Sequence, residues 1–501
     1  MAFSSLSTLS KLSSTVSTPL NRSSPSNLVQ LSSTSSSLTF SFTDPSGTVT
    51  SYVPYINGNS ATGSGNKSSY TINGLNASLI YNVTIRARGV GGLSQPSPIS
   101  YMSTNSGSII NTIAGNGVQG YGGDGGLAGN ASISNNCNYI CGDIGGNIYI
   151  TDQDNNRIRI IYAGNNVINT IAGNGTLGYS GDGGLATNAT LYYPNGIVTD
   201  SSNNLYIADG SSRIRKVFFG NNIITTIAGN GPGFGPYNGD GQIASNVWIG
   251  APRDVIIDLS NNVCFTSSTM LIHKVFQGNG IITTIAGTGT NLTFSNAGSS
   301  NGDGGLATGA SFSQFTGMCI DNGGNIYVAE YGLNWYSDVR IIYAGNNYIN
   351  TFAGNGNPSP LSSGDGNIAN SSLVNISQPF GVCLDSSMNL YIVEQGGCTV
   401  RKVFFGNNII TTIAGTRGIT GYSGDGSIAT SATLNYPQGI SVVSNGNVFI
   451  CDTKNNRIRS FNQNGIYNNL PSNLTQISAN SSSVTFSFTP PTGLPSSYSN
   501  Y

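Results

Sequence analysis

Residues 195–218 read NGIVTDSSNNLYIADGSSRIRKVF, and this stretch decides the fold. It contains three short segments, GIVTD, NLYIAD and RIRKVF, which are rich in Ile, Val, Tyr and Thr. A fourth segment of the same kind, IITTIAG, follows at residues 223–229. Gly, Asn and Ser separate the segments, and short β-branched or aromatic runs between such turn residues are typical of β-strands. The stretch therefore predicts a unit of four β-strands.

The unit is repeated along the chain. The motif Ile-Ala-Gly or Phe-Ala-Gly recurs at intervals of 56 to 67 residues and ends at Gly115, Gly173, Gly229, Gly287, Gly354 and Gly415. An Asp-Gly pair follows each copy, at Asp124, Asp182, Asp240, Asp303, Asp365 and Asp425. An asparagine beside the second strand recurs as Asn147, Asn204, Asn262, Asn325, Asn389 and Asn447. Self-similarity of this kind is the signature of a repeat architecture, so we expect six structural units.

One four-stranded unit cannot bury both of its faces by itself. A ring of units covers each face with a neighbour and leaves only short strand edges exposed. The sixth unit, which ends near RIRSFNQNGIY, has three strong strands, whereas SIINTIAG at residues 108–115 stands alone before the first complete unit. We therefore predict an all-β fold with a six-bladed β-propeller over residues 107–467, in which residues 108–113 complete the sixth blade.

The units resemble the NHL repeat family. Members of that family carry a pattern like G-x-x-x-D, N-x-Y-x-x-D and R-I-R-K-V, which is seen here at Gly196, Asp200, Asn204, Tyr206, Asp209 and residues 213–217. The resemblance covers residues 107–467 and rests on six aligned copies. It implies a six-bladed propeller that usually serves as a binding platform, although relatives include enzymes and RNA-binding proteins.

A second kind of module flanks the repeats. Residues 26–47, SNLVQLSSTSSSLTFSFTDPSG, reappear almost position for position at 472–493 as SNLTQISANSSSVTFSFTPPTG. The first copy continues with alternating strands and resembles a fibronectin type III domain, with Phe42 where such domains usually place a tryptophan. We expect a fibronectin type III-like β-sandwich at 25–103 and an incomplete second sandwich at 471–501.

The two ends of the chain carry separate expectations. Residues 1–24 are rich in Ser and Thr, with Lys11 and Arg22 as their only charges, and are predicted to be a flexible leader. The start, MAFSSLSTLSKL, lacks the continuous apolar segment of a secretory signal. Half a sandwich cannot bury its inner face, so we expect residues 471–501 to be poorly ordered or weakly docked. The sequence leaves open whether the natural chain continues beyond Tyr501.

The composition argues against several classes of partner. The chain has 68 glycines, only 8% charged residues and a net charge of −1, so uncharged polar residues must cover its surface. Nucleic-acid recognition depends on clustered Lys and Arg, but the 19 Lys and Arg are spread through the repeats. No apolar run approaches 18 residues. We expect a monomer with no nucleic-acid partner and no membrane insertion.

The cellular compartment stays open at this point. Seven cysteines form an odd count without the spacing of a disulfide framework. Cys141, Cys319 and Cys383 occupy the strand position that Val198 holds in another unit, which is typical of small apolar core residues. This pattern favours free thiols and a reducing compartment, whereas the flanking sandwich modules favour an extracellular setting.

The loop GYSGDGGLATNA at residues 178–189 has the glycine content of a phosphate-binding loop. No copy supplies the lysine that such a loop needs, so Asp182 is expected to accept hydrogen bonds from nearby amides or to cap a turn. Calcium is the alternative, although one carboxylate per loop is few for a cation that takes six to eight oxygens. We predict no cofactor and structural roles for the loop aspartates Asp124, Asp182, Asp240, Asp303, Asp365 and Asp425.

The single histidine, His273, stands where other units have the second arginine of R-I-R, which is Arg159, Arg215, Arg340, Arg401 or Arg459. In the same unit Ser267 replaces the acid that ends the second strand, which elsewhere is Asp152, Asp209, Glu330, Glu394 or Asp452. We interpret this as the loss of an acid and arginine pair rather than as a catalytic histidine. One histidine can build neither a His-rich zinc site nor several triads, so we expect no enzyme activity.

Connectivity predicts one working face of the ring. In an up-and-down blade, the loop after the fourth strand and the loop after the second strand emerge on the same side. The fourth unit has insertions in both: Asp303 lies 16 residues after Gly287, where the second unit has nine, and ten residues separate Glu330 from Arg340 instead of six. The added residues include aromatic groups that are enriched at binding hot spots. The predicted partner-binding residues are Phe294, Tyr331, Trp335 and Tyr336.

These features together predict a non-enzymatic interaction scaffold that binds a protein or a glycan through one loop face of the propeller. The alternative is a propeller hydrolase or lyase with a metal in the central channel. An enzyme needs acids or histidines that converge at the channel mouth, whereas a binding protein needs exposed aromatic residues on the rim. The sequence does not identify the partner.

Overall fold

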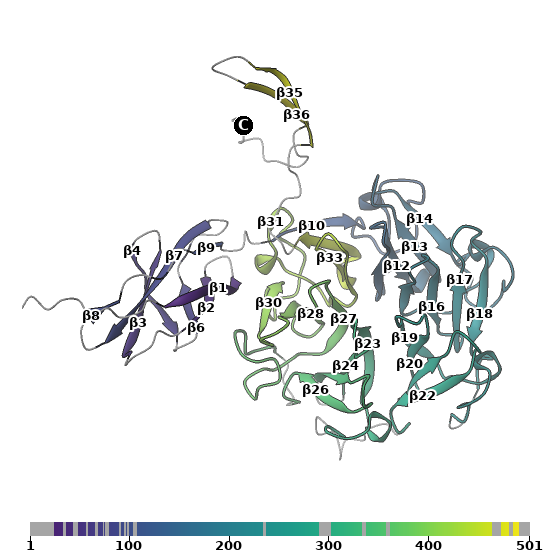
Figure 1. The fold of residues 1–501 in the computed structure, drawn as a ribbon. Coiled ribbons are helices and arrows are strands. Elements are labelled where there is room, and N and C mark those ends of the chain that lie inside the picture. Colours follow the sequence, from purple (N-terminus) through teal and green to yellow (C-terminus); the bar gives the residue numbers. More distant parts are fainter. Residues whose placement is uncertain are drawn as a thin grey trace, which may run out of the picture. The chain divides into compact units, whose positions relative to one another are not determined.

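The computed structural model describes most of the chain, and all regular structure in that part is β-strand or short 3-10 helix (Figure 1). The chain divides into two compact units, Met1–Gly107 and Ser108–Tyr501. No helix among the described residues is long and apolar enough to cross a membrane. The described residues are 25–33, 37–43, 49–56, 59–65, 69–73, 75, 80–89, 92–94, 97, 100–103, 108–233, 237–289, 302–332, 337–356, 361–462, 472–479 and 484–489.

The first unit is a β-sandwich. One sheet has the order β1 (Ser26–Ser33), β2 (Ser37–Thr43), β6 (Ser69–Asn73) and β5 (Gly63–Gly65). The other has the order β4 (Asn59–Ser60), β3 (Ser51–Ile56), β7 (Ile80–Gly89) and β8 (Gly92–Leu93), and β9 (Ser100–Ser103) also pairs with β7.

Alternate residues of β2 form the core of this sandwich. Leu38, Phe40 and Phe42 are buried together with Val83 and Ile85 of β7. The ring of Phe42 lies against Tyr52 of the second sheet, with centroids 4.7 Å apart. Phe42 therefore contributes its aromatic ring to the contact between the two sheets.

Six antiparallel sheets make up the propeller, and in each the first strand of the repeat lies innermost (Figure 1). The strands of blades one to three are β11 (Ile140–Gly142), β12 (Ile148–Asp152), β13 (Arg157–Ile161) and β14 (Ile168–Ala172); β15 (Ile197–Thr199), β16 (Leu205–Asp209), β17 (Arg213–Val217) and β18 (Ile224–Ala228); and β19 (Pro252–Ile257), β20 (Val263–Ser267), β21 (Ile272–Val275) and β22 (Ile282–Ala286).

Blades four to six repeat the pattern. Their strands are β23 (Gln314–Ile320), β24 (Ile326–Tyr331), β25 (Ser337–Ile342) and β26 (Ile349–Ala353); β27 (Pro379–Leu384), β28 (Leu390–Glu394), β29 (Thr399–Val403) and β30 (Ile410–Ala414); and β32 (Ile440–Val442), β33 (Asn447–Asp452), β34 (Arg457–Asn462) and β10 (Ile109–Ala114), with the short β31 (Ser427–Ile428) outside β10. Single 3-10 turns after the Asp-Gly loops are η1 (Ala128–Asn130), η3 (Ala186–Asn188), η4 (Ala244–Asn246), η5 (Ala307–Gly309) and η7 (Ala429–Ser431), and two more, η2 (Gln153–Asn155) and η8 (Thr453–Asn455), lie between strands two and three.

The blades form a closed ring. Their innermost strands contact one another in the order β11, β15, β19, β23, β27 and β32, and β32 contacts β11 again. β10, the first strand of the second unit, pairs antiparallel with β34, placing Thr112 opposite Arg459. The prediction that residues 108–113 complete the sixth blade is confirmed.

Burial between neighbouring blades explains why the ring must close. Tyr149, Ile158 and Ile160 of blade one pack in one apolar cluster with Leu205 and Ile207 of blade two. Equivalent clusters fill the other junctions described in the propeller. A blade without its neighbour would expose this surface to water, at a cost of about 25 cal/mol per Å².

The recurrent asparagine and tyrosine of the repeat act together at the turn between strands one and two. In blade two, Asn204 donates from its side chain to Asp200 Oδ2 (2.9 Å), and the Tyr206 hydroxyl donates to the same oxygen (3.1 Å). Asn204 Oδ1 accepts from the backbone of Phe219 (3.0 Å), which belongs to the turn between strands three and four. These residues therefore tie two turns of one blade together.

The C-terminal copy of the sandwich sequence forms a hairpin of β35 (Ser472–Ala479) and β36 (Val484–Thr489). Its register matches that of β1 and β2, since Ser472 pairs with Thr489 as Ser26 pairs with Thr43. The repeated sequence thus gives the same strand pairing in both copies.

Removing β10 tests the closure of the ring. A chain that starts at Ser108 keeps β10, whereas one that starts at Gly115 loses the fully buried Ile110 and Ala114 and the pairing with β34. We expect the shorter chain to lose more than about 3 kcal/mol of propeller stability. Urea unfolding of the two chains measures this loss, and equal midpoints would contradict the role of β10.

Candidate binding face

The Asp-Gly loops and the ends of the second strands lie on one face of the propeller. In blade two, the fully buried Arg215 donates from Nη2 to Asp182 Oδ1 of the loop (2.7 Å) and lies with Nη1 3.4 Å from Asp209 Oδ2 at the end of β16. One arginine therefore joins the two loops that connectivity places on the same side. We call this side the Asp-Gly face.

The same bridge recurs in four further blades. The arginines are buried in each case, and each contacts a loop aspartate and a strand-end acid. The triplets are Asp124–Arg159–Asp152, Asp303–Arg340–Glu330, Asp365–Arg401–Glu394 and Asp425–Arg459–Asp452.

The two acids of a triplet have different environments. Burial raises the pKa of Asp209, although backbone hydrogen bonds from Ser211 and Tyr192 and the charge of Arg215 act in the opposite direction. Burial also favours a higher pKa for Asp182, but a hydrogen bond from Thr226 and the charge of Arg215 outweigh it, so the pKa of Asp182 is lowered. The charge of each arginine is thus shared between a deep acid and a half-exposed one.

A tyrosine covers this bridge on the solvent side. The ring of Tyr179 lies over the guanidinium of Arg213 (3.4 Å from its centroid) and near that of Arg215 (4.8 Å), and its hydroxyl donates to Asp182 Oδ2 (2.9 Å). Tyr121 and Tyr422 have the same contacts in blades one and six. Arginine and aspartate contacts hold these three rings in place, while part of each tyrosine stays exposed to solvent.

A second group of exposed tyrosines precedes the innermost strands. The backbone N–H of Tyr192 donates to Asp209 Oδ1 (3.0 Å), and that of Tyr193 donates to Asn156 Oδ1 of blade one (3.1 Å). Tyr193 and Tyr436 have φ values of 43° and 48°, which a bulky residue adopts only when its surroundings hold it there. The two neighbouring rings, Tyr192 and Tyr193, meet edge to face with centroids 5.2 Å apart.

Blade three lacks the arginine bridge. His273 is fully buried in the position of the arginine, with its ring 4.3 Å from that of Tyr237 and its Nε2 3.4 Å from Ser267 Oγ. Burial lowers the pKa of His273 to about 4, so the imidazole is neutral at pH 7. Asp240 instead accepts hydrogen bonds from the hydroxyls of Tyr237 and Thr284 (both 3.0 Å).

The innermost strands approach closely at this face. The backbone N–H of Gly381 donates to the carbonyl of Gln438 in the next blade (3.0 Å), and a Cβ on Gly381 would lie only 2.5 Å from that oxygen. Tyr139 replaces this glycine in blade one, and its hydroxyl donates to the Thr316 carbonyl of the opposite blade (2.5 Å). The ring of Tyr139 also packs against Phe380. The channel is therefore bridged by a side chain at the Asp-Gly face.

Asp254 replaces the same glycine in blade three. Its two oxygens accept from the backbone N–H groups of Val255 (2.8 Å) and Met318 (2.7 Å), so it links blades three and four. Burial raises its pKa to about 7 in spite of these hydrogen bonds. Asp254 is thus a structural acid whose oxygens are already engaged.

The innermost strands of all six blades enclose a cavity of about 240 Å³. Most of its lining is aliphatic, and Cys141, Cys319 and Cys383 contribute thiols to it. Across the described part of the chain, no three His, Cys, Asp or Glu side chains are grouped so that they could hold a metal ion. The described residues of the channel therefore do not fit the metal of the alternative hydrolase or lyase interpretation.

The predicted aromatic insertion is only partly described. Tyr331 ends β24, opposite Gln314 and Ser337, and so lies at the Asp-Gly face. Phe294, Trp335 and Tyr336 lie outside the described residues, and their roles stay predictions. Sequence reasoning missed the six exposed tyrosines, although the first of the two groups recurs three residues before the loop aspartate in G-Y-x-G-D-G.

Family comparisons agree with this architecture. The fibronectin type III domain model matches residues 23–103, and the NHL repeat model matches residues 434–461. The chain therefore contains a fibronectin type III domain and a β-propeller that carries an NHL repeat. Fibronectin type III domains are common in extracellular proteins.

Two curated relatives match part of the chain. Protein SUPPRESSOR OF QUENCHING 1, chloroplastic, from Arabidopsis thaliana is 25% identical over 309 residues, which cover 58% of this chain and 27% of that protein. Teneurin-1 from Caenorhabditis elegans is 27% identical over 254 residues, which cover 48% of this chain and 9% of that protein. The chain thus spans less than a third of the length of either relative.

A solved structure shares the fold. A protein of unknown function from Bacteroides thetaiotaomicron VPI-5482 superposes with a TM-score of 0.51 at 17% identity, over 87% of this chain and 97% of that one. At this level of identity the likeness shows the fold alone.

Blade three offers a direct test of the arginine bridge. We expect Ser267→Asp alone to lower propeller stability by about 3 kcal/mol, because it places a carboxyl at a buried position beside a neutral histidine. We expect His273→Arg in the same chain to recover at least about 1 kcal/mol of that loss by restoring the pair. Urea unfolding of the double-mutant cycle measures the coupling, and strictly additive effects would contradict the bridge.

Asp254 predicts a pH dependence of stability. The pKa of Asp254 rises from 3.8 in the unfolded chain to about 7 in the fold. Its contribution to the free energy of unfolding is therefore fully present below pH 4 and is lost as the pH rises to 7. The stability of the wild type should fall by up to about 1.4 kcal/mol per pH unit in this window relative to Asp254→Gly, which restores the glycine of blades two, four, five and six. Urea midpoints from pH 4 to pH 8 test this, and parallel curves for the two proteins would refute it.

Proposed function

We propose that this protein is a non-enzymatic interaction scaffold that holds a protein or glycan partner on the Asp-Gly face of its propeller. One observation carries the proposal. Six tyrosines on this face are each 41% to 45% exposed. They are Tyr121, Tyr179, Tyr192, Tyr193, Tyr422 and Tyr436. Arginines stack on the rings of three of them, the backbone N–H groups of Tyr192 and Tyr193 are hydrogen-bonded, and Tyr436 has the same left-handed backbone as Tyr193.

Exposed tyrosines suit this role for a physical reason. A tyrosine offers a large flat apolar surface and a hydroxyl while having only two side-chain torsions to order on binding. In Tyr179, stacking on Arg213 and the hydrogen bond to Asp182 already restrict those torsions in the folded protein. The entropy lost on binding is therefore small at such positions.

The charges of the face favour a partner of low charge. Five of the six loop aspartates contact a buried arginine that offsets part of their charge, whereas Asp240 of blade three contacts two hydroxyls instead. The whole chain carries a net charge of −1. Sugar hydroxyls and polar protein loops both match such a surface, which is why the proposal names a protein or a glycan.

The insertion of blade four extends the proposed surface. Tyr331 lies at the end of β24 on the Asp-Gly face, and residues 333–336 follow directly in the chain before β25 begins. Phe294, Tyr331, Trp335 and Tyr336 are therefore proposed as further partner contacts. Aromatic residues such as these dominate the energetics of many interfaces.

The chain itself supplies substitutions that test this proposal. Gln378 has the same left-handed backbone as Tyr193 and Tyr436, and Asn435 occupies the position of Tyr192 in blade six. We expect the variant Tyr192→Asn, Tyr193→Gln, Tyr436→Gln to fold normally and to weaken partner capture by at least about tenfold. Capture is measured by cross-linking in cell extract with mass spectrometry and by binding to a glycan array.

A matched control removes aromatic residues elsewhere. Phe219 and Phe405 lie in the turns between strands three and four, on the side opposite to the Asp-Gly face, and blade three has Gln277 in this position. Phe219→Gln with Phe405→Gln should leave capture unchanged. The proposal is wrong if the tyrosine variant binds like the wild type, or if the control loses as much binding. Trp335→Ala with Tyr336→Ala tests the insertion in the same assay.

A further inference from the structure

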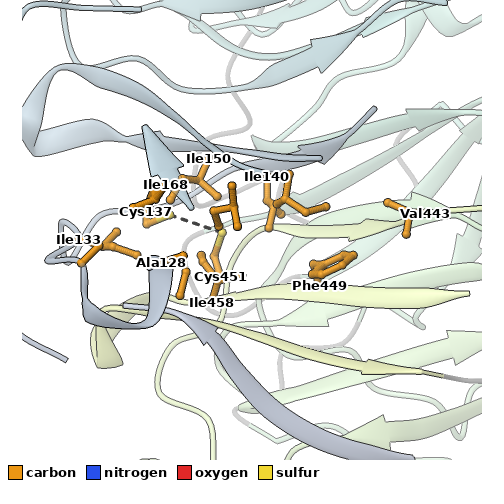
Figure 2. Close-up of a cluster of buried hydrophobic side chains, with 14 residues drawn as sticks. Ala128, Ile133, Cys137, Ile140, Ile150, Ile168, Val443, Phe449, Cys451 and Ile458 are labelled. Carbon is orange, nitrogen blue, oxygen red and sulfur yellow. Dashed lines mark hydrogen bonds between the residues drawn. The ribbon is translucent and has the colours of Figure 1, made fainter. Parts of the chain in front are cut away.

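Two buried thiols meet where the first and last blades join. Cys137 precedes β11 of blade one, and Cys451 lies in β33 of blade six. Their sulfur atoms are 3.7 Å apart although 314 residues separate them in the chain. Figure 2 shows the two side chains directed at one another inside an apolar cluster that includes Ile140 and Ile458. Both residues are almost completely buried.

The pair is unique to this junction among the six of the ring. Cys137 lies two residues before Tyr139, the position that is Gly196 in blade two. The residue equivalent to Cys137 is proline or phenylalanine in the other blades: Pro194, Pro252, Phe315, Pro379 and Pro437. The residue before the strand-end acid is threonine, alanine or valine in the other blades: Thr151, Ala208, Thr266, Ala329 and Val393. Cysteine therefore replaces both repeat positions only where the ring closes, and the two replacements face each other.

The backbone around the pair is already held in place. The Thr453 hydroxyl of blade six donates to the Cys137 carbonyl (3.1 Å), and Lys454 Nζ donates to the Asn135 carbonyl of blade one (3.2 Å). The Cys451 backbone N–H donates to the Gly439 carbonyl of the innermost strand (2.9 Å). The junction thus fixes the two cysteine backbones, and only a rotation of side chains is needed to change the sulfur separation.

We infer that Cys137 and Cys451 are a site of oxidative cross-linking, at which a disulfide joins the first blade to the last and locks the ring shut. A disulfide bond is about 2.05 Å long, so the sulfurs must approach by about 1.6 Å from their present contact. This distance is small enough for side-chain rotation within the junction. We therefore expect the oxidised pair to form without a rearrangement of the two blades.

The chemistry requires a low-molecular-weight disulfide such as oxidised glutathione. One cysteine thiolate attacks a sulfur of this oxidant, which gives a mixed disulfide and releases one small thiol. The second cysteine thiolate then attacks the protein sulfur of the mixed disulfide and releases the second small thiol. The two cysteines lose two protons and two electrons, and the oxidant gains them. Because the folded junction excludes solvent, the reaction takes place as the ring closes or when the junction opens transiently.

Refolding in a glutathione buffer tests the inference on the full chain. Reduced protein is unfolded in urea and refolded with reduced and oxidised glutathione, and a parallel sample is refolded under reductant. We expect denatured samples to show five free thiols after oxidation instead of the seven of the reduced chain, and a peptide that links Cys137 to Cys451. The propeller should melt about 5 °C or more higher when oxidised, because the bond closes a very long loop.

Matched variants separate this site from the other thiols. Cys137→Pro with Cys451→Ala carries residues found at these positions in other blades and should melt at the same temperature in both buffers. Cys383→Ser removes a channel thiol, keeps the pair, and should still gain the cross-link. The thiol count is repeated on native protein incubated with oxidised glutathione just below its melting temperature, so that the result does not depend on refolding yield. Seven free thiols in both procedures, or a link between another pair such as Cys319 and Cys383, would overturn the inference.

Discussion

Each blade of this protein has two apolar faces that only another blade can cover, and the rest of the structure depends on this constraint. The clusters that contain Ile158 and Ile207, or Val448 and Val393, are shared between neighbouring blades and belong to neither alone. A row of such blades has two uncovered ends, whereas a ring has none. The pairing of β10 with β34 is what turns the row into a ring.

The closed ring also gives the Asp-Gly face its rigidity. Arg215 is buried between Asp182 of a loop and Asp209 of a strand, so the loop is anchored to the blade by charge as well as by backbone hydrogen bonds. Tyr179 then rests on the anchored loop. A surface built in this way holds its aromatic groups in one arrangement, and loops on rigid scaffolds are where proteins place recognition. The hydrogen bond from Tyr139 to Thr316 spans the channel at this same face.

The repeat made most of the fold predictable, because strand periodicity and six aligned copies fix the number of blades and the pairing of residues 108–113 with the last one. The substitution of His273 and Ser267 for arginine and acid also indicates an acid and arginine pair in the other blades, but not its burial or its contact with the loop aspartate. The roles of Tyr139 and Asp254 could not be predicted in this way. Each forms a hydrogen bond with a residue of another blade, and the repeat pattern does not give the distance between such residues. The contact between Cys137 and Cys451 was hidden for the same reason: the two residues occupy different repeat positions and meet only after closure.

The pairing of β10 has a consequence for synthesis in the cell. Asn111 of β10 accepts a hydrogen bond from Gly426, which leaves the ribosome 315 residues later. At about 5 to 20 residues per second, that interval lasts on the order of tens of seconds. Throughout it the nascent chain displays a strand without its neighbours, and unpaired strands attract other chains. The time between the first and last residues of the propeller is therefore the period in which a growing polypeptide of this kind most needs a chaperone.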